Sequence, residues 1–160
     1  KREGLKMQYW LFKSEPDDYS IDDLKAEPKQ TGRWDGIRNY QARNLIRDQI
    51  KPGDGVLFYH SSCKTVGVAG TAEVVSAPYP DPLQFSTDSK YFDPKSTEAE
   101  PRWLAIDIKY VATAKRLLPL KEIKTNTDLE NMVLVKQGRL SIQPVSESEW
   151  KTIQKLIGLM

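Results

Sequence analysis

Residues 32–44 read GRWDGIRNYQARN and bring together two aromatic residues, three arginines, two asparagines and two glycines. The aromatic rings are flat surfaces suited to stacking, and the arginines are planar donors suited to phosphate or carboxylate. Asn39 and Gln41 add paired donors and acceptors, and the glycines let the backbone turn sharply beside Trp34. This mixture favours a site for a planar, polar, anionic ligand, for which a nucleotide is the first candidate. A second interpretation stays open, in which Trp34 is a core residue and the arginines form a solvated helix face.

The composition is that of an ordinary globular domain. The chain has 160 residues, with 39% hydrophobic and 29% charged residues, enough for one domain with its own core. No apolar run is long enough to span a membrane, and the first residues lack the apolar stretch of a signal peptide. We expect a short tail over residues 1–6, a natural start at Met7 and a single domain over 7–158. We also expect an intracellular monomer without membrane contact, cytoplasmic in a bacterium or nuclear in a eukaryote.

Positive charge is concentrated locally although the net charge is only +2. Five lysines and arginines but only two aspartates lie within residues 33–51. A local basic patch on a nearly neutral protein favours binding at one site over wrapping of long nucleic acid. Arg38 and Arg43 are therefore candidate phosphate contacts, and a solvated helix face is the alternative for both.

Cys63 and His60 limit the possible chemistry, because each is the single residue of its type. One cysteine allows no disulfide within the chain, which fits a reducing compartment. A zinc site of cysteine and histidine ligands would need more of either residue. The two residues lie three positions apart in a predicted turn, and no pair of carboxylates or nucleophile with its base stands out. We therefore expect no catalytic residue, metal or cofactor, and a hydrogen-bonding role for His60.

The first half of the chain alternates strand and helix patterns. Residues 7–13 predict an aromatic-rich strand that Pro16 ends, and Ser20 predicts the cap of a short helix. Residues 28–32 predict a loop, and Asn39 predicts the cap of a helix over 40–50. Two strands, 56–60 and 65–76, are expected to pair with each other, with a bend or bulge at Gly67 and Gly70.

The second half begins with a long proline-rich loop over residues 77–101, whose aromatic residues indicate that it is ordered. A strand over 103–111, one or two short helices over 120–132 and a final helix opened by the capping box 146–149 follow. Arg139, Ser141 and Gln143 are expected on one face of a strand. Trp10, Trp103 and Trp150 are expected in the core. Together these elements predict an α+β fold, a small curled sheet or barrel with helices around it.

Six sequence blocks resemble the EVE domain, of which the thymocyte nuclear protein family is the eukaryotic branch. The blocks are residues 9–16, 34–44, 58–63, 79–82, 91–96 and 138–145. The resemblance implies a PUA-like fold, a mixed β pseudo-barrel with short flanking helices. EVE domains in turn resemble YTH domains, which hold N6-methyladenine of RNA in an aromatic cage. The resemblance therefore implies a partner, DNA or RNA that carries a modified base.

Parts of the YTH pattern match this sequence residue by residue. Lys13 and Ser14 resemble the pair at the end of the first YTH strand that borders the base pocket. Trp34 resembles the first cage tryptophan, and Arg139 resembles a polar position near the nucleic-acid surface. The second cage tryptophan has no obvious counterpart, so N6-methyladenine itself is not specified as the ligand. Candidates to replace that tryptophan are Tyr59, Tyr79, Phe85 and Tyr91.

The functional hypothesis is a non-catalytic reader with an aromatic and polar pocket and a basic rim. A nuclease-like enzyme of the PUA-like superfamily is the alternative. We expect Trp34, Ser14 and Tyr59 to line one cavity, with Asn39 at its rim. The predicted base-binding residues are Lys13, Ser14, Trp34, Asn39, Tyr40, Tyr59, His60 and Ser141, and the predicted phosphate-binding residues are Arg38, Arg43 and Arg139.

Overall fold

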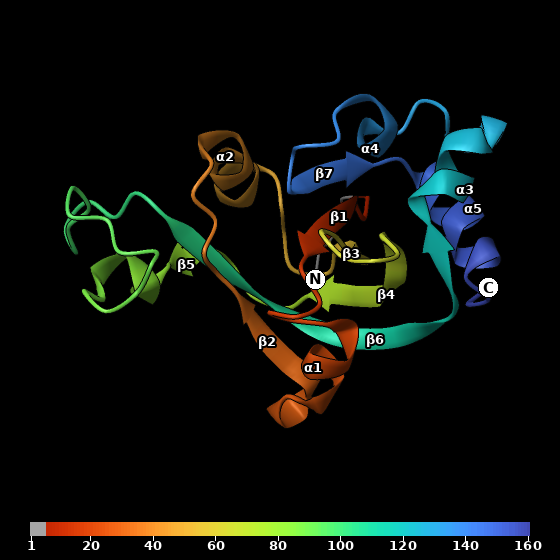
Figure 1. Cartoon of the computed structure of the whole chain (residues 1–160). Helices are drawn as coiled ribbons and strands as arrows, with labels where there is room; N and C mark the ends of the chain where they lie inside the picture. Colours follow the sequence, from red (N-terminus) through yellow and green to blue (C-terminus); the bar gives the residue numbers. More distant parts are fainter. Residues whose placement is uncertain (1–5) are drawn as a thin grey trace.

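Two parallel strands of alternating side chains form the centre of the sheet. The computed structural model describes residues 6–160. Strand β1 (Tyr9–Ser14) lies parallel to β3 (Gly55–His60), in a register that pairs the last residues of the two strands with each other (Figure 1). On its other side β1 pairs antiparallel with β7 (Ile142–Val145), and β3 pairs antiparallel with β4 (Gly67–Val74). The expected pairing of the second and third strand patterns is confirmed.

The remaining strands extend the sheet on the side of β4. The long strand β6 (Leu104–Pro119) pairs with β4, with β2 (Thr31–Trp34) and with the short β5 (Tyr79–Pro80). Within residues 6–160 the order is β2-β6-β4-β3-β1-β7, and the path does not close between β2 and β7. The α+β class is confirmed, with a mixed, open sheet.

The sheet is strongly curled. The register shifts between Val68 and Gly70 where β4 meets β6, next to the two glycines expected to mark a bulge, and such irregularities increase the local twist. As a result the ring of Trp34, on edge strand β2, lies 5.3 Å from the ring of Phe12 on β1, although β6, β4 and β3 separate these strands in the sheet. Side chains thus bring together strands that the hydrogen-bond ladder keeps apart.

Short helices with well-defined caps surround this sheet (Figure 1). Asn39 Oδ1 accepts a hydrogen bond from Ala42 N, while Ser20 and Ser146 form capping boxes, so all three expected helix starts are confirmed. The α-helices are α1 (Ile21–Ala26), α2 (Tyr40–Asp48), α3 (Leu120–Thr125), α4 (Val133–Lys136) and α5 (Glu147–Leu156), and the 3-10 helices are η1 (Pro28–Gln30), η2 (Pro82–Phe85) and η3 (Thr127–Leu129).

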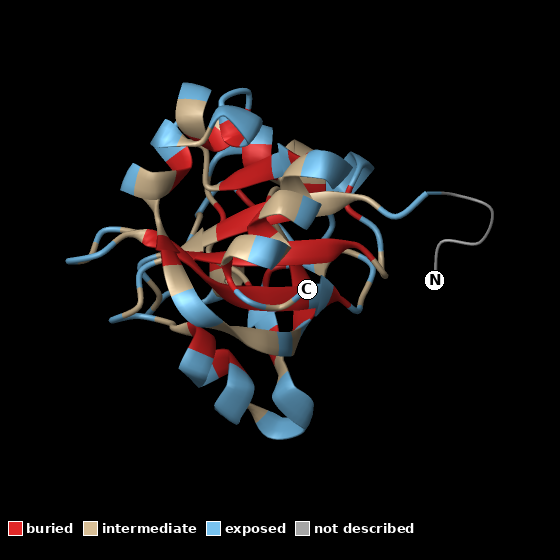
Figure 2. Cartoon of the chain, turned by 90° about the vertical axis from the view of Figure 1, so that its right-hand side faces the viewer, coloured by how far each residue is buried: buried red, intermediate tan, exposed pale blue. Residues whose placement is uncertain are grey.

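Two hydrophobic clusters occupy the two faces of the sheet. Alternation along β1 sends Trp10 and Phe12 into the first cluster and Leu11 into the second. Figure 2 shows the buried residues gathered in the strands, with exposed residues on the outer sides of the helices. No helix in the described residues has the length and apolar character needed to cross a membrane.

Three element boundaries differ from expectation. Residues 28–32 do not form a simple loop, because η1 and the start of β2 occupy them. Strand β6 runs to Pro119, because its second part, from Ala112 to Pro119, pairs with β4. Strand β7 begins only at Ile142. Five residues of the expected tail, 1–5, lie outside the described residues.

Candidate functional site

An aromatic cluster occupies the inner face of the curled sheet. It consists of Phe12, Tyr19, Trp34 and Phe58. The Trp34 ring lies 5.3 Å from the Phe12 ring and 5.5 Å from the Phe58 ring, with Tyr19 edge-on at 6.4 Å. Trp34 is only 7% exposed, so it is a core residue in this structure. Its stacking against a base stays a prediction.

Ser14 and His60 lie beside this cluster, at the paired ends of β1 and β3. Alternation places them on the same sheet face as Phe12 and Phe58, and the His60 ring lies 5.8 Å from the Phe58 ring. Ser14 Oγ donates to the Tyr19 carbonyl oxygen at 2.6 Å. The structure therefore places Ser14 and His60 beside the aromatic cluster, and a shared contact of Ser14 and Trp34 with a base stays a prediction.

His60 forms a hydrogen bond between two secondary-structure elements. His60 Nε2 accepts from Ile21 N at 3.1 Å, which ties β3 to the first residue of α1. Burial lowers the pKa of His60, and the nearby Asp22 opposes this shift. Both the bond and the lowered pKa favour the neutral imidazole. The Cys63 thiol is instead in contact with the Thr65 carbonyl oxygen, at 3.4 Å.

Tyr59 does not share the face of Trp34, so the predicted cavity of Trp34, Ser14 and Tyr59 is wrong. Tyr59 follows Phe58 along β3 and therefore points to the second cluster, where it is 3% exposed. Burial raises the pKa of its hydroxyl to about 12. Lys13 lies on that face too, with its ammonium 5.7 Å from the centre of the Tyr59 ring.

Lys13 joins the end of β1 to the loop 137–141, which we call the Arg139 loop. The Lys13 ammonium donates to the Gly138 carbonyl, and Lys13 N donates to the Ser141 carbonyl at 2.9 Å. Burial lowers the pKa of Lys13. Arg139 itself is exposed at the surface of the loop. Lys13 therefore lies beside the loop that carries Arg139 and Ser141.

The expectation that Arg139, Ser141 and Gln143 alternate on one strand face is wrong, because β7 starts after Ser141. Gln143 is 1% exposed and turns back toward the loop. Its Nε2 donates to the carbonyls of Gln137 at 3.2 Å and of Leu140 at 2.8 Å. Gln143 thus holds the backbone of the Arg139 loop in place through two hydrogen bonds from its buried side chain.

The remaining predicted residues gather at the start of α2. Asn39 is the helix cap. Tyr40 is 49% exposed, and its ring packs on Trp103 with the ring centres 4.7 Å apart. The Arg43 guanidinium lies 4.8 Å from the centre of the Tyr40 ring and donates to the Arg102 carbonyl at 2.7 Å. Tyr40 and Arg43 therefore form a partly exposed pair at the start of α2.

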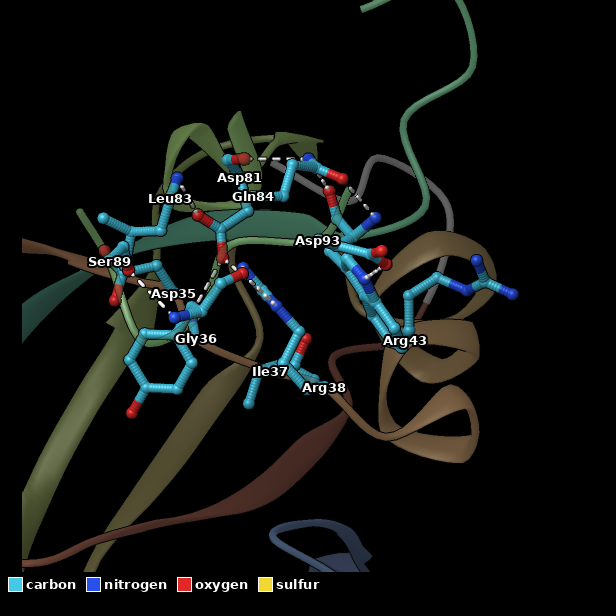
Figure 3. Close-up of polar contacts among 12 residues, drawn as sticks. Asp35, Gly36, Ile37, Arg38, Arg43, Asp81, Leu83, Gln84, Ser89 and Asp93 are labelled. Atoms are coloured by element: carbon cyan, nitrogen blue, oxygen red, sulfur yellow. Dashed lines mark hydrogen bonds and ion pairs between the residues drawn. The ribbon is translucent and has the colours of Figure 1, made fainter. Parts of the chain in front are cut away.

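Arg38 is held inside the protein. It forms an ion pair with Asp81 at 2.9 Å, with the two side chains 20% and 0% exposed (Figure 3). Its Nε and Nη2 both donate to the Tyr91 carbonyl. Arg38 was predicted to contact phosphate, but its nitrogens are instead occupied within the protein, because the loop 77–101 packs against residues 35–39 and supplies the acceptors. Asp81 was not among the predicted site residues, although its place between two prolines in a loop expected to be ordered was a usable signal.

The EVE domain signature matches residues 8–156. This chain belongs to the EVE domain family. It is 44% identical over 165 residues to human thymocyte nuclear protein 1, covering 92% of this chain and 73% of the human protein. A solved structure of human THYN1 protein in complex with DNA containing 5-methylcytosine superimposes with a TM-score of 0.89 at 43% identity, over 94% of this chain and 98% of that one.

A more distant likeness shows that a YTH domain has a similar fold. The YTH domain of MRB1 from Zygosaccharomyces rouxii, solved in complex with N6-methyladenosine RNA, superimposes with a TM-score of 0.54. It shares 15% sequence identity and covers 94% of this chain and 86% of that one. At this identity the likeness concerns the fold alone.

Proposed function

We propose that this EVE domain binds nucleic acid that carries a methylated base, with DNA containing 5-methylcytosine as the first ligand to test. The observation that carries the proposal is the human THYN1 complex, whose protein matches 94% of this chain at 43% identity. The same fold over nearly the whole chain supplies a common framework for a common type of ligand.

The site that we propose for the base lies at the paired ends of β1 and β3, next to the aromatic cluster. Ser14 and His60 supply polar atoms there, and Trp34 supplies the largest ring. An aromatic surface with a few fixed polar groups is the usual composition of a pocket for a nucleobase. Because Trp34 is 7% exposed, we propose that binding uncovers more of its ring.

The backbone of the nucleic acid is expected to lie along two basic positions. Arg139 is exposed on its loop, and Arg43 is half-buried beside Tyr40. Phosphate contacts from such residues supply affinity without sequence preference. Arg38 is not included, because its nitrogens already bond within the protein.

The proposal is tested by titration with matched duplex oligonucleotides that differ only in one 5-methyl group, and with single-stranded RNA with and without N6-methyladenine. One methyl group in a fitted apolar pocket is worth roughly 1–3 kcal/mol, so we expect about tenfold tighter binding of the methylated DNA. Equal Kd values for both members of each pair would contradict the proposal. Gel analysis of the same samples with Mg²⁺ detects cleavage, the result expected of the nuclease-like alternative.

The contribution of Trp34 is best measured with Trp34→Phe, which keeps most of the buried volume. Trp150→Phe is the matched control, since Trp150 stacks on Tyr9 at 4.6 Å in the other cluster. We expect the first variant to lose part of the about tenfold methyl selectivity, because phenylalanine offers a smaller ring than tryptophan for stacking against a base. The control is expected to keep it. Equal selectivity in both variants would remove Trp34 from the proposed site.

A further inference from the structure

The carboxylate of Asp81 is the point where the loop 77–101 meets the β2–α2 connection, residues 35–39. Asp81 is completely buried. Its Oδ2 accepts from Gly36 N at 2.8 Å and from Arg38 Nη1 at 2.9 Å, while its Oδ1 accepts from Leu83 N at 2.7 Å (Figure 3). One carboxylate thus binds two positions of the connection and one of its own loop.

Arg38 fastens the same connection to the loop a second time. Its Nε and Nη2 donate to the Tyr91 carbonyl at 3.1 and 3.0 Å, and its Nη1 donates to the Ile37 carbonyl at 2.9 Å. The guanidinium carbon lies 5.4 Å from the ring centres of both Tyr91 and Trp103. Planar contacts and charge-assisted bonds of this kind fix orientation as well as distance.

Gly36 allows the connection to bend here, because its backbone is in the left-handed region, with φ at +75°, which glycine adopts without steric cost. A Cβ at this position would lie 3.0 Å from the Tyr91 ring. The loop therefore covers the bend closely, and a glycine is required there. The bend separates Trp34 from the cap residue Asn39, so its shape sets how these two residues face one another.

The loop can act as a support because it is itself anchored to the sheet. Gln84 is completely buried, and its Nε2 donates to the carbonyls of Asp81 and Trp103 at 2.8 Å each. Its Oε1 accepts from Arg102 N and Trp103 N at 3.1 and 3.0 Å. A chain of hydrogen bonds thus runs from residues 102–103, directly before β6, through Gln84 and Asp81 to Gly36.

We infer that Asp81 is a positioning residue for recognition of the methylated base, because it holds the connection that carries Trp34 at one end and Asn39 at the other. The inference rests on the proposed function and adds to it the residue that orders the site. Asp81 acts through the backbone of Gly36 and the side chain of Arg38 and does not touch the ligand. The loop 77–101 accordingly contributes to recognition by holding residues 35–39 in place.

The test compares Asp81→Asn with Asp54→Asn. Asp54 is an equally buried carboxylate that accepts from Trp10 Nε1 at 2.9 Å and from Lys51 N at 3.0 Å. Both variants lose a buried charge, but only the first lies at the connection. With 5-methylcytosine and cytosine duplexes as probes, we expect Asp81→Asn to reduce the ratio of the two Kd values by roughly threefold or more, up to complete loss of the about tenfold preference. Asp54→Asn is expected to leave that ratio unchanged, with both variants measured well below their Tm.

A double variant covers the case in which Asp81→Asn fails to fold. Removing one partner of a buried pair leaves the other charge uncompensated, whereas removing both is better tolerated. Arg38→Gln with Asp81→Asn therefore gives a neutral pair that still lacks the carboxylate at Gly36. We expect this double variant to fold and to show the same loss of selectivity.

Each outcome has a defined consequence. Selectivity retained in Asp81→Asn, or in the double variant, overturns the inference and leaves the proposed function in place. An equal loss in Asp81→Asn and Asp54→Asn also overturns it, since general stability would then explain both. Absence of selectivity in the unchanged chain overturns the proposed function, and the inference with it.

Discussion

At the scale of single residues, Trp34 is both a part of the hydrophobic core and the proposed contact for the base. It touches the rings of Phe12 and Phe58 and is almost completely buried. Truncating such a side chain removes its apolar contacts and leaves a cavity. Loss of binding in Trp34→Ala would therefore not by itself identify a ligand contact. Trp34→Phe is the better test of binding, because it keeps most of the buried volume.

The first prediction concerns the stability of the alanine variant at Trp34. Trp34→Ala is expected to lower the free energy of unfolding by about 3–5 kcal/mol, the usual cost of emptying an aromatic core position. Tyr40→Ala, at a half-exposed ring, is expected to lower it by about 1 kcal/mol. Urea unfolding followed by circular dichroism measures both. Similar small losses in the two variants would show that Trp34 contributes little to the core.

His60 gives a prediction about pH. Burial lowers its pKa below the ordinary 6.5, so the unfolded chain binds a proton at a higher pH than the folded chain. The contribution of His60 to stability is therefore complete above about pH 7 and is lost as the pH falls from 6.5 through the lower folded pKa. We expect Tm to fall over that range. His60→Gln keeps an acceptor for Ile21 N, and its Tm should be nearly flat there; a parallel decline would assign the effect to other groups.

At the scale of elements, helix α2 depends on a cap that also ends the β2–α2 connection. Asn39 Oδ1 accepts from Ala42 N at 3.0 Å. Asn39→Ala is expected to cost about 1 kcal/mol of unfolding free energy, and Asn39→Asp to restore most of it, because aspartate keeps the acceptor. Ser146→Ala, at the cap of α5, is the control for a cap far along the chain from the site. The two alanine variants should lose similar stability, and Asn39→Ala alone should weaken binding of the methylated duplex.

At the scale of the whole molecule, the charges at the surface set the salt dependence of binding. Arg139 is exposed, and Arg139→Gln is expected to reduce the slope of log K against log salt by about one unit. Arg116→Gln is the matched control, because Arg116 is an exposed arginine paired with Glu122 at 2.8 Å. Titrations at several salt concentrations compare the slopes. An unchanged slope in Arg139→Gln would place that residue outside the phosphate path.

The sequence by itself determined the features that depend on neighbouring residues. The strand patterns and caps of Ser20, Asn39 and Ser146 depend on local hydrogen bonds and on the alternation of apolar residues. The α+β class followed from the order of these elements, and the six motif blocks indicated the family. The resemblance also indicated that Ser14 and Trp34 belong to one base pocket, which stays a prediction.

Only the tertiary structure decided which of the predicted residues meet. Curling of the sheet brings Trp34 of β2 onto Phe12, although three strands lie between β2 and β1 in the sheet. Alternation along β3 sends Tyr59 and His60 to opposite faces of the sheet, but only the tertiary packing decided which of the two faces lies beside Trp34. The fold of the loop 77–101 likewise buries Asp81 against Arg38, which changes an expected phosphate ligand into an internal ion pair. These outcomes depend on contacts between residues far apart in the chain, and local patterns carry no information on such contacts.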